Sequence, residues 1–230
     1  MKKNKFSGLI GAAWVLALAS SSTMAQTQSL GPNTTSTPIP LTTPVDWNKS
    51  LEFSQFNPAL GTLISVELNL STTLSTTLTI TNASATISSS TAFTELQITV
   101  QDVGGNLSVS NQPQLDVLSP NFAYNLAGDS SITSGPLTNT GVFSKTFTQS
   151  SLLSEFAGSG SVTLNASTFT LAYTSDATGA TSASQSTEAS LTGNVIYNYD
   201  PTSTPEPSAF ALLLVGLSVL GLRARTLKRP

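Results

Sequence analysis

The sequence contains no cysteine and no histidine, and only 9% of its 230 residues are charged. Without cysteine there is no disulfide framework and no thiol nucleophile, and without either residue type a zinc site lacks its usual sulfur and nitrogen ligands. A Ser-His-Asp triad has no base. The net charge of −3 argues against a nucleic-acid-binding protein, which needs a basic surface. These absences exclude several enzyme classes, and we expect a non-enzymatic protein that holds no cofactor and no nucleic acid.

The few charges are distributed unevenly along the chain. Seven of the nine Lys and Arg residues lie within residues 1–5 and 223–230, whereas all twelve acidic residues lie between Asp46 and Glu206. Positive charge beside apolar segments determines how a chain inserts into a membrane, because basic residues stay on the cytoplasmic side. Both ends therefore carry the pattern of a membrane-directed segment.

The N-terminus has the three parts of a secretory signal peptide. Lys2, Lys3 and Lys5 precede an apolar stretch at 9–18, and small polar residues continue to Ala25. A basic region, an apolar region of about ten residues and a small residue at the cleavage site are typical of such peptides. We predict that residues 1–25 direct the chain to the Sec translocon and that signal peptidase cleaves after Ala25. The alternative, a membrane anchor, needs a longer apolar run.

The C-terminus combines a Pro-Glu-Pro motif, an apolar segment and a basic tail. Pro205, Glu206 and Pro207 precede the apolar residues 209–222. As a helix rising about 1.5 Å per residue, this segment is about 21 Å long, shorter than a hydrocarbon core of about 30 Å. Basic side chains at its end can extend its reach and stay cytoplasmic. They are Arg223, Arg225, Lys228 and Arg229 in the tail 223–230. Residues 201–230 therefore predict a transmembrane sorting helix that holds the chain in the inner membrane transiently.

This tail resembles the PEP-CTERM sorting signal over residues 205–230. That family belongs to Gram-negative bacteria that make extracellular polysaccharide. The resemblance implies recognition by exosortase, a membrane-embedded cysteine protease, and cleavage near Pro205–Pro207. Release or attachment at the cell surface would follow. The same tail is also known as an ice-binding-protein C-terminal domain, a label that by itself proves no ice binding. The alternative is a plain tail anchor.

Between these ends the pattern changes near residue 46. Residues 26–46 are rich in Ser, Thr and Pro, and prolines at that density exclude helices and interior strands, so we expect an extended leader. From 47 to 200, apolar and polar residues alternate, as Leu96, Ile98 and Val100 do with their neighbours. Such alternation is typical of antiparallel sheets with one face on a core. We predict a single all-β domain at 47–200, an antiparallel β-sandwich or jelly roll.

The expected strands are short and separated by turn residues. They are 51–54, 63–70, 77–81, 95–100, 107–110, 142–148, 161–165, 169–173 and 191–199. Turns are expected at 104–106, 111–113, 128–129 and 158–160, where Gly, Asn, Asp and Pro gather. Residues 151–156 are the one segment with a helical pattern.

Three stretches of this body resemble the choice-of-anchor E domain of bacterial surface proteins. They are FSQFNPALGTLISVEL at 53–68, FAGSGSV at 156–162 and VIYNY at 195–199. Asn57 stands where that family often has Asp, which weakens a carboxylate role at this position. The resemblance implies a surface domain without an established enzymatic activity.

Two sets of polar residues are candidates for chemistry. A glycoside hydrolase needs two carboxylates across a cleft, and the acids on expected strand faces are Glu52, Glu67 and Glu95. Solvation at the strand surface explains them more simply. A structural calcium would use oxygen donors in the expected turns, which are Asp102, Asn106 and Asp129. The chain lacks the Asp-x-Asp-x-Gly pattern of a calcium loop.

Two further sets are candidates for binding. Aromatic rings pack against the apolar faces of sugars, and the candidates are Trp47, Tyr124, Tyr173, Tyr197 and Tyr199. Packing inside the fold is the competing explanation, most clearly for the last two, which share a strand face. Thr77, Thr79 and Thr81 also share a face, and flat Thr arrays bind ice in several folds. One short strand, however, makes no two-dimensional array.

The sequence therefore predicts an exported, non-enzymatic protein of the bacterial surface or extracellular matrix. We expect exosortase to process it after transient anchoring in the inner membrane. We also expect it to associate with extracellular polysaccharide or biofilm. The alternatives are a carbohydrate-binding module and an ice-binding protein.

Overall fold

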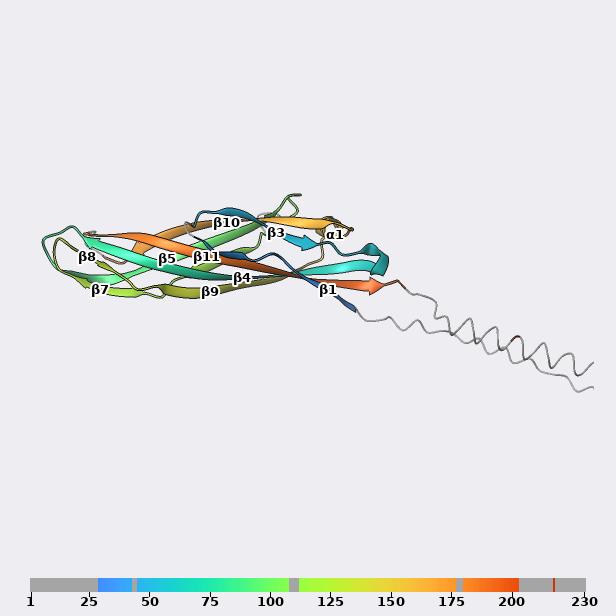
Figure 1. The fold of residues 1–230 in the computed structure, drawn as a ribbon, viewed down its shortest axis with the longest axis horizontal. Helices are drawn as coiled ribbons and strands as arrows, with labels where there is room; N and C mark the ends of the chain where they lie inside the picture. The colour runs from blue at the N-terminus through green and yellow to red at the C-terminus, as the bar shows by residue number, and fades with distance from the viewer. Residues whose placement is uncertain (1–28, 43–44, 108–111, 177–179, 203–216, 218–230) are drawn as a thin grey trace, which may run out of the picture.

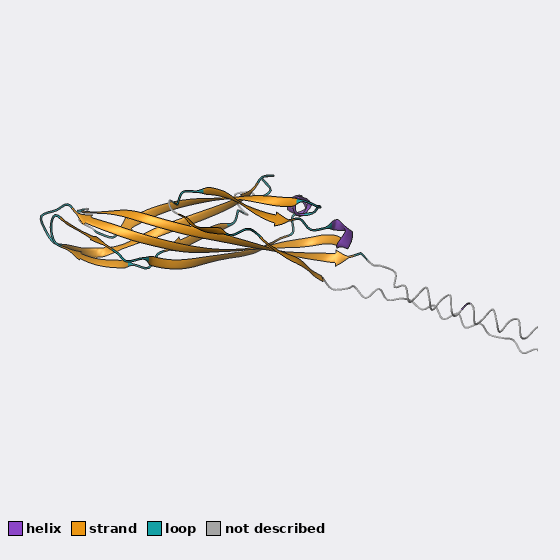
Figure 2. Ribbon diagram, viewed as in Figure 1, coloured by secondary structure: helices purple, strands orange, loops and turns teal. Residues whose placement is uncertain are grey.

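The computed structural model describes residues 29–42, 45–107, 112–176, 180–202 and Leu217. In these residues the chain forms two antiparallel β-sheets that pack face to face as an elongated sandwich (Figure 1, Figure 2). The prediction of an antiparallel all-β sandwich is confirmed. The expected helical turn at 151–156 is also confirmed, as α1 (Ser150–Phe156).

The first sheet is built around two long neighbouring strands. β4 and β11 pair along almost their whole length, with β1 and β2 beside β11 and β8 and β9 beside β4. We call this sheet A. Its strands are β1 (Ser29–Thr35), β2 (Ile39–Thr42), β4 (Gly61–Asn82), β8 (Ser130–Thr133), β9 (Leu137–Phe147) and β11 (Thr181–Pro201).

The second sheet, sheet B, has the order β3-β10-β5-β6, and β7 also pairs with β5. Its strands are β3 (Asn48–Ser54), β5 (Ser88–Asp102), β6 (Gln114–Leu118), β7 (Phe122–Leu126) and β10 (Ser161–Thr174). The short 3-10 helix η1 (Pro58–Leu60) precedes β4, and α1 joins β9 to β10.

The core fills the space between the sheets, and the long strands β4 and β5 contribute every second residue over most of their length. A large apolar cluster occupies one half, and a smaller one, with Leu78 and Tyr124, occupies the other. Buried hydroxyls lie between them: Thr76 Oγ1 is 2.7 Å from Thr187 Oγ1 and 3.1 Å from Thr94 Oγ1. A buried hydroxyl without a partner is costly, so these threonines satisfy one another across the two sheets.

The β-sandwich begins at Ser29, earlier in the chain than residue 47, where the sequence predicted the start of the β domain. Much of the segment 26–46, expected as an extended leader, forms β1 and β2, which pair with β11. Both strands lie beside only one neighbour, and a proline can occupy such an edge because its missing N–H is not needed there. The prolines are therefore incompatible with an interior strand, as expected, but they are compatible with the edge strands β1 and β2.

Several strands are longer than the alternation indicated. The expected strands 63–70 and 77–81 are parts of β4, and 161–165 and 169–173 are parts of β10. β11 begins at Thr181 instead of 191, and β6, β7 and β8 were not expected. Leu107 lies in a bend, and the rest of the expected strand 107–110 falls outside the described residues.

The chain enters and leaves the sandwich at the same end. Ser29 at the start of β1 pairs with Tyr199 near the end of β11. We call this end the base, and the opposite end, where Asn82 pairs with Thr181, the tip. At about 3.3 Å per residue, the 21 residues of β11 span about 70 Å between them.

The predicted sorting segments lie outside the described residues, apart from residues 201–202 and Leu217. This holds for the signal peptide 1–25, its cleavage site Ala25 and the helix 209–222. It holds equally for Pro205, Glu206, Pro207, Arg223, Arg225, Lys228 and Arg229. In the part of the chain that the structure describes, no helix has both the length and the apolar character needed to cross a membrane.

Candidate functional site

The three stretches that resemble the choice-of-anchor E domain come together near the base. Phe56 packs against two aromatic rings of β11, with its ring centroid 5.0 Å from that of Tyr199 and 5.8 Å from that of Tyr197. Phe156 of α1 packs against Tyr197 from another side, at 6.3 Å. Phe56, Phe156 and Tyr197 are each at most 2% exposed, so these rings form a core and not a binding surface.

Hydrogen bonds join the same stretches. The Phe56 N–H donates to the carbonyl of Phe156 at 2.8 Å, and the Gly158 N–H donates back to the carbonyl of Phe56 at 2.9 Å. The Tyr197 hydroxyl donates to the carbonyl of Ser54 at 2.6 Å. Burial raises the pKa of Tyr197, so this hydroxyl keeps its proton as a donor. The motif residues therefore assemble the base of the fold.

Gly61 and Asn57 have structural roles beside this core. Gly61 has a φ of 153°, and a Cβ there would lie 2.0 Å from the carbonyl oxygen of Asp200. Only glycine allows β4 and the end of β11 to approach so closely. Asn57 accepts the Ala59 N–H at 3.0 Å and thereby caps η1.

A pair of carboxyl groups lies beside the loop that follows β5. Asp102 is 6% exposed and accepts the backbone N–H groups of Asn106 at 2.6 Å and Leu107 at 2.8 Å. The Asn106 amide donates to Glu155 Oε2 at 3.0 Å. Burial opposes ionisation of Asp102, but the backbone N–H groups of Leu107 and Asn106, together with a hydrogen bond to Glu155, outweigh it and lower the pKa of Asp102. Burial and the neighbouring Asp102 raise the pKa of Glu155.

The structure separates the residues considered for calcium binding. It brings Asp102 and Asn106 together, but Asp129 lies at the other end of β5, about 45 Å away at 3.3 Å per residue. Within the described ranges no three Asp, Glu, His or Cys side chains are grouped as metal ligands. Glu155, which the sequence reasoning missed, is the residue that completes the carboxyl pair. Nothing in the sequence around Glu155 indicated that it would contact Asn106, which lies 49 residues earlier in the chain.

The structure also separates the acids considered for glycoside hydrolysis. Glu67 lies on sheet A, whereas Glu52 and Glu95 lie on sheet B. Glu52 pairs with Thr163 and Glu95 with Leu171 along β10, a separation of about 26 Å. Catalytic carboxyl groups of glycosidases are about 5–9.5 Å apart. These three residues therefore form no such pair.

Substitution of Asp102 should destabilise the fold at neutral pH. We expect Asp102→Asn to lower the free energy of unfolding by about 1–3 kcal/mol, because the two N–H groups bond to different carboxylate oxygens and an amide has only one acceptor oxygen. The folded pKa of Asp102 is lowered, so its contribution is present above the unfolded value of 3.8 and is lost as the pH falls through the folded pKa. Urea unfolding at pH 7 and at decreasing pH measures both effects.

Glu155→Gln is the matched control for this pair. The folded pKa of Glu155 is raised, so its contribution is present below the unfolded value of 4.5 and is lost as the pH rises through the folded pKa. At pH 7 the amide should therefore leave the stability unchanged or increase it. If both variants destabilise the fold equally at pH 7, the charged forms of Asp102 and Glu155 do not have opposite effects on stability, and this interpretation is wrong.

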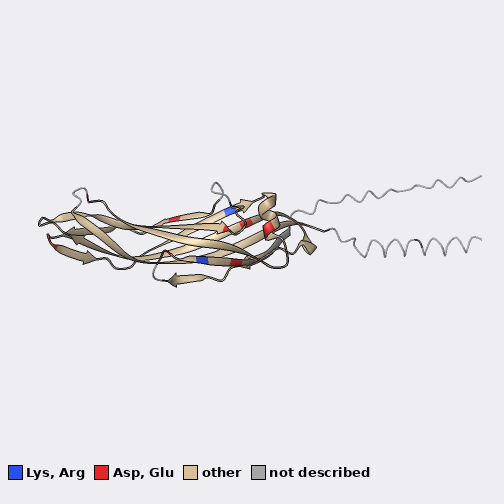
Figure 3. Cartoon of the chain, turned by 90° about the horizontal axis from the view of Figure 1, so that it is seen from above, with Lys and Arg blue, Asp and Glu red and all other residues tan. Residues whose placement is uncertain are grey.

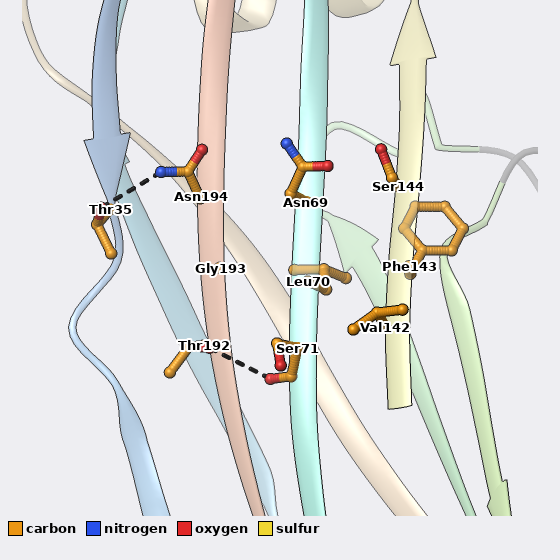
Figure 4. A pocket seen from close by; sticks show the side chains of 10 residues that line it. All are labelled: Thr35, Asn69, Leu70, Ser71, Val142, Phe143, Ser144, Thr192, Gly193 and Asn194. Carbon is orange, nitrogen blue, oxygen red and sulfur yellow. Dashed lines mark hydrogen bonds between the residues drawn. The ribbon is translucent and has the colours of Figure 1, made fainter. Parts of the chain in front are cut away.

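A hollow of about 320 Å³ lies on the outer face of sheet A, where β1, β11, β4 and β9 run side by side (Figure 4). Amide and hydroxyl side chains line it, including Asn194, Asn69 and Ser144, and Val142 at its border is 82% exposed. The Thr192 hydroxyl donates to the carbonyl of Ser71 at 3.3 Å. No lining residue is charged. Leu70, Val142 and Phe143 add apolar groups to these hydrogen-bonding side chains (Figure 4).

The outer face of sheet A carries rows of hydroxyl groups. Thr77, Thr79 and Thr81 pair with Ser186, Ser184 and Ser182 of β11, and the last two threonines also pair with Thr133 and Ser131 of β8. The Thr run lies on the single strand β4, as expected. Its hydroxyl neighbours on β11 and β8 were not expected, because residues 181–190, with little apolar character, were not predicted to be a strand.

The aromatic candidates divide by exposure. Trp47, Tyr124 and Tyr197 are buried, at 8%, 5% and 1% exposed, and Tyr199 packs on Phe56, so packing explains these four. Tyr173 is 37% exposed on the outer face of sheet B. It stacks on Phe93 with a centroid distance of 5.1 Å and an interplanar angle of 22°. Phe93 was not expected to take part, because the aromatic candidates considered were Trp and Tyr.

Comparison with known proteins assigns the chain to no family. No family model matches it, and no curated protein matches it. Among solved structures, a particle of infectious bursal disease virus matches at 14% identity and a TM-score of 0.17, over 84% of this chain and 48% of the other. The Gt strain of the same virus matches at 13% identity and a TM-score of 0.14, over 86% and 51%.

The chain thus spans about half the length of these capsid chains. TM-scores this low carry no argument about its fold or function. The likenesses of the tail to PEP-CTERM and of the body to choice-of-anchor E remain predictions from the sequence.

Proposed function

We propose that this protein is an exported, non-enzymatic component of the bacterial surface or extracellular matrix, released or attached by exosortase at its C-terminal signal. One observation carries the proposal: β1 and β11 pair at the base, so residues 1–28 and 203–230 both connect to the same end of the sandwich. A body joined to the membrane through that end would project its tip and both sheet faces outward over about 70 Å.

The negative charge of the described residues favours association with a matrix of uncharged polymers. Among the described residues, Lys49 and Lys145 are the basic side chains, against eleven acidic ones (Figure 3). An acidic surface repels acidic polymers and stays soluble in a hydrated matrix. The outer faces instead offer Ser, Thr, Asn and Gln groups, which exchange hydrogen bonds with sugar hydroxyls.

The carboxyl pair supports a non-enzymatic function. Asp102 accepts two backbone N–H groups of its own loop, and Glu155 accepts the Asn106 amide. A general acid or base needs free access to a substrate proton. Both carboxyl groups help to hold the loop after β5 against α1, and Asp102, at 6% exposed, has little surface left for a substrate.

Deletion of residues 205–230 tests the sorting proposal. We expect the truncated protein to fold and to be exported, but to lose its retention at the cell surface, because exosortase would have no substrate. Cell fractionation and intact mass of the exported protein measure this. A matched variant with Ala in place of Pro205, Glu206 and Pro207 keeps the apolar segment and should block cleavage alone.

Two outcomes would contradict the proposal. The truncated protein would be retained at the surface as the full chain is, or the mature protein would still contain residues 209–222 in its measured mass. Either result would mean that the Pro-Glu-Pro tail is not a cleaved sorting signal.

The hydroxyl rows of sheet A favour a second candidate function, ice binding. Thr79 Oγ1 lies 3.0 Å from Thr133 Oγ1 on the neighbouring strand, so hydroxyls repeat across strands as well as along them. Glu188, opposite Ser75, interrupts the rows, and the twist of long strands curves them. Thermal hysteresis of the exported protein that is lost in Thr79→Glu would establish ice binding. A wild-type protein without thermal hysteresis would exclude ice binding.

A further inference from the structure

The outward face of β10 carries large apolar side chains where polar ones are expected. Phe169, Leu171 and Tyr173 are 55%, 41% and 37% exposed, while the inward positions between them hold Thr170 and Ala172. A strand with one buried face normally has the opposite arrangement. Exposed apolar patches on a folded protein mark interaction sites.

The register of β10 imposes this exposure. Val162, Leu164 and Ala166 at the other end of the strand are buried, so every odd-numbered residue faces outward. The pairing with β3 and β5 runs without a bulge. A slip of one residue would bury Phe169 but expel Leu164. The register of the sandwich therefore keeps Phe169, Leu171 and Tyr173 exposed to solvent.

The row widens into a surface across three strands. Phe93 of β5 pairs with Tyr173 and stacks on its ring, and Leu118 of β6, 50% exposed, pairs with Glu95. We call Phe93, Leu118, Phe169, Leu171 and Tyr173 the aromatic ledge. Leu171 also pairs with Glu95, so this carboxylate lies between the apolar side chains of β10 and β6.

Hydrogen-bonding groups are interleaved with the ledge. Gln97 pairs with Phe169 on one side and Asp116 on the other, and its amide donates to Asp116 Oδ1 at 3.2 Å. A hydrogen bond to Glu95 raises the pKa of Tyr173, whose hydroxyl stays neutral. Two hollows adjoin the ledge, of about 150 Å³ at Phe169 and Tyr173 and about 390 Å³ at Phe93 and Leu118.

This combination suits a sugar chain better than a lipid or an apolar protein surface. Ring faces pack against the apolar C–H face of a pyranose, while carboxylates and amides bond its hydroxyls. A fully apolar partner would desolvate Glu95 and Asp116 without pairing them. β5, β6 and β10 contain no Lys or Arg, so an acidic sugar would meet only negative charge.

We propose that the aromatic ledge, with Glu95, Gln97 and Asp116, is a binding site for a polysaccharide without acidic sugars. The proposal rests on the proposed function and deepens it, because it assigns the contact with the matrix to one face of sheet B. The ledge lies toward the tip, since Tyr173 pairs with Phe93 near the end of β10. The base, where the sorting segments connect, stays free.

Affinity electrophoresis and calorimetry of the exported protein test the site. The probes are a neutral glucan, a galactan, a mannan and poly-N-acetylglucosamine, with alginate as the acidic polymer. We expect binding to at least one non-acidic probe and none to alginate. Phe169→Ala and Tyr173→Ala should each weaken it at least tenfold. The control Val142→Ala removes an apolar side chain that is 82% exposed on sheet A, away from the ledge, and should leave the binding unchanged.

Several results would overturn the proposal. They are no binding to any non-acidic probe, binding to alginate alone, or equal binding by the ledge variants and the wild type. Concentration-dependent dimerisation lost in Phe169→Ala would instead identify the ledge as a contact between two copies. Urea midpoints of the variants must match the wild type, so a loss of binding reports the site and not the fold.

Fractionation of the same variants separates the two proposals. Ledge variants that are exported and processed normally but bind no glycan support both. Normal sorting with a wild type that binds no probe overturns the ledge proposal alone. Surface retention independent of residues 205–230 overturns the proposed function, whatever the probes show.

Discussion

Phe56→Ala should lower the free energy of unfolding by about 3–5 kcal/mol, the range for a fully buried phenylalanine. Phe56 is 0% exposed and contacts both tyrosine rings near the end of β11. Its removal leaves a cavity that the surrounding backbone cannot close, because the hydrogen bonds with Phe156 and Gly158 hold both sides of it. Urea unfolding followed by the fluorescence of buried Trp47 measures the loss.

Phe169→Ala is the matched control, since the same atoms are removed at a side chain that is 55% exposed. We expect a change within about 0.5 kcal/mol there. Equal losses at the two positions would show that Phe169 is part of the core and that the aromatic ledge is not a free surface. A loss under about 1 kcal/mol at Phe56 would show that the base tolerates the cavity.

Asn82→Asp should destabilise the tip by about 3 kcal/mol or more at neutral pH. Asn82 is 0% exposed, and its amide donates to the carbonyls of Thr86 at 2.8 Å, Ala127 at 3.1 Å and Leu126 at 3.3 Å. Its oxygen accepts the Ser84 N–H at 3.0 Å. A carboxylate keeps this acceptor but turns a negative charge toward three carbonyl oxygens.

The penalty at Asn82 should depend on pH. The introduced carboxyl would have a folded pKa above its unfolded value, because protonation restores a donor. The protein would therefore be most stable below the unfolded pKa of about 3.9 and lose stability as the pH rises through the folded pKa. Asn125→Asp is the control: Asn125 is exposed and accepts the Ser89 hydroxyl, which a carboxylate also does. Equal, pH-independent effects at both positions would contradict the role assigned to Asn82.

The sheet interior was largely predictable from local pattern. Leu96, Ile98 and Val100 alternate with polar residues and are all buried in β5, as expected. Residues 181–190 were missed because their inward side chains, such as Ala183 and Ala189, are small and contrast weakly with the outward serines. Their strand character comes from pairing with β4, about 100 residues or more away in the sequence.

The candidate site was predictable only in part. Tyr173 was a candidate for sugar binding, but so were four other aromatic residues, and these pack in or against the core. Phe169 and Leu171 are apolar, and alternation alone would assign such residues to the core. Asp102 and Asn106 were considered together, but their partner Glu155 comes from a helix that no spacing rule connects to them.

The sequence by itself determined the period of the strands, the turns between them and the segregation of basic and apolar residues to the two ends. These properties depend on neighbouring residues, so they can be read locally. The tertiary structure decided which face of β10 meets the core, which strands make the hydroxyl rows and which carboxyl groups meet. Those outcomes depend on the register between distant strands: the buried residues 162–166 set the orientation of the whole of β10, and its apolar row must then face water.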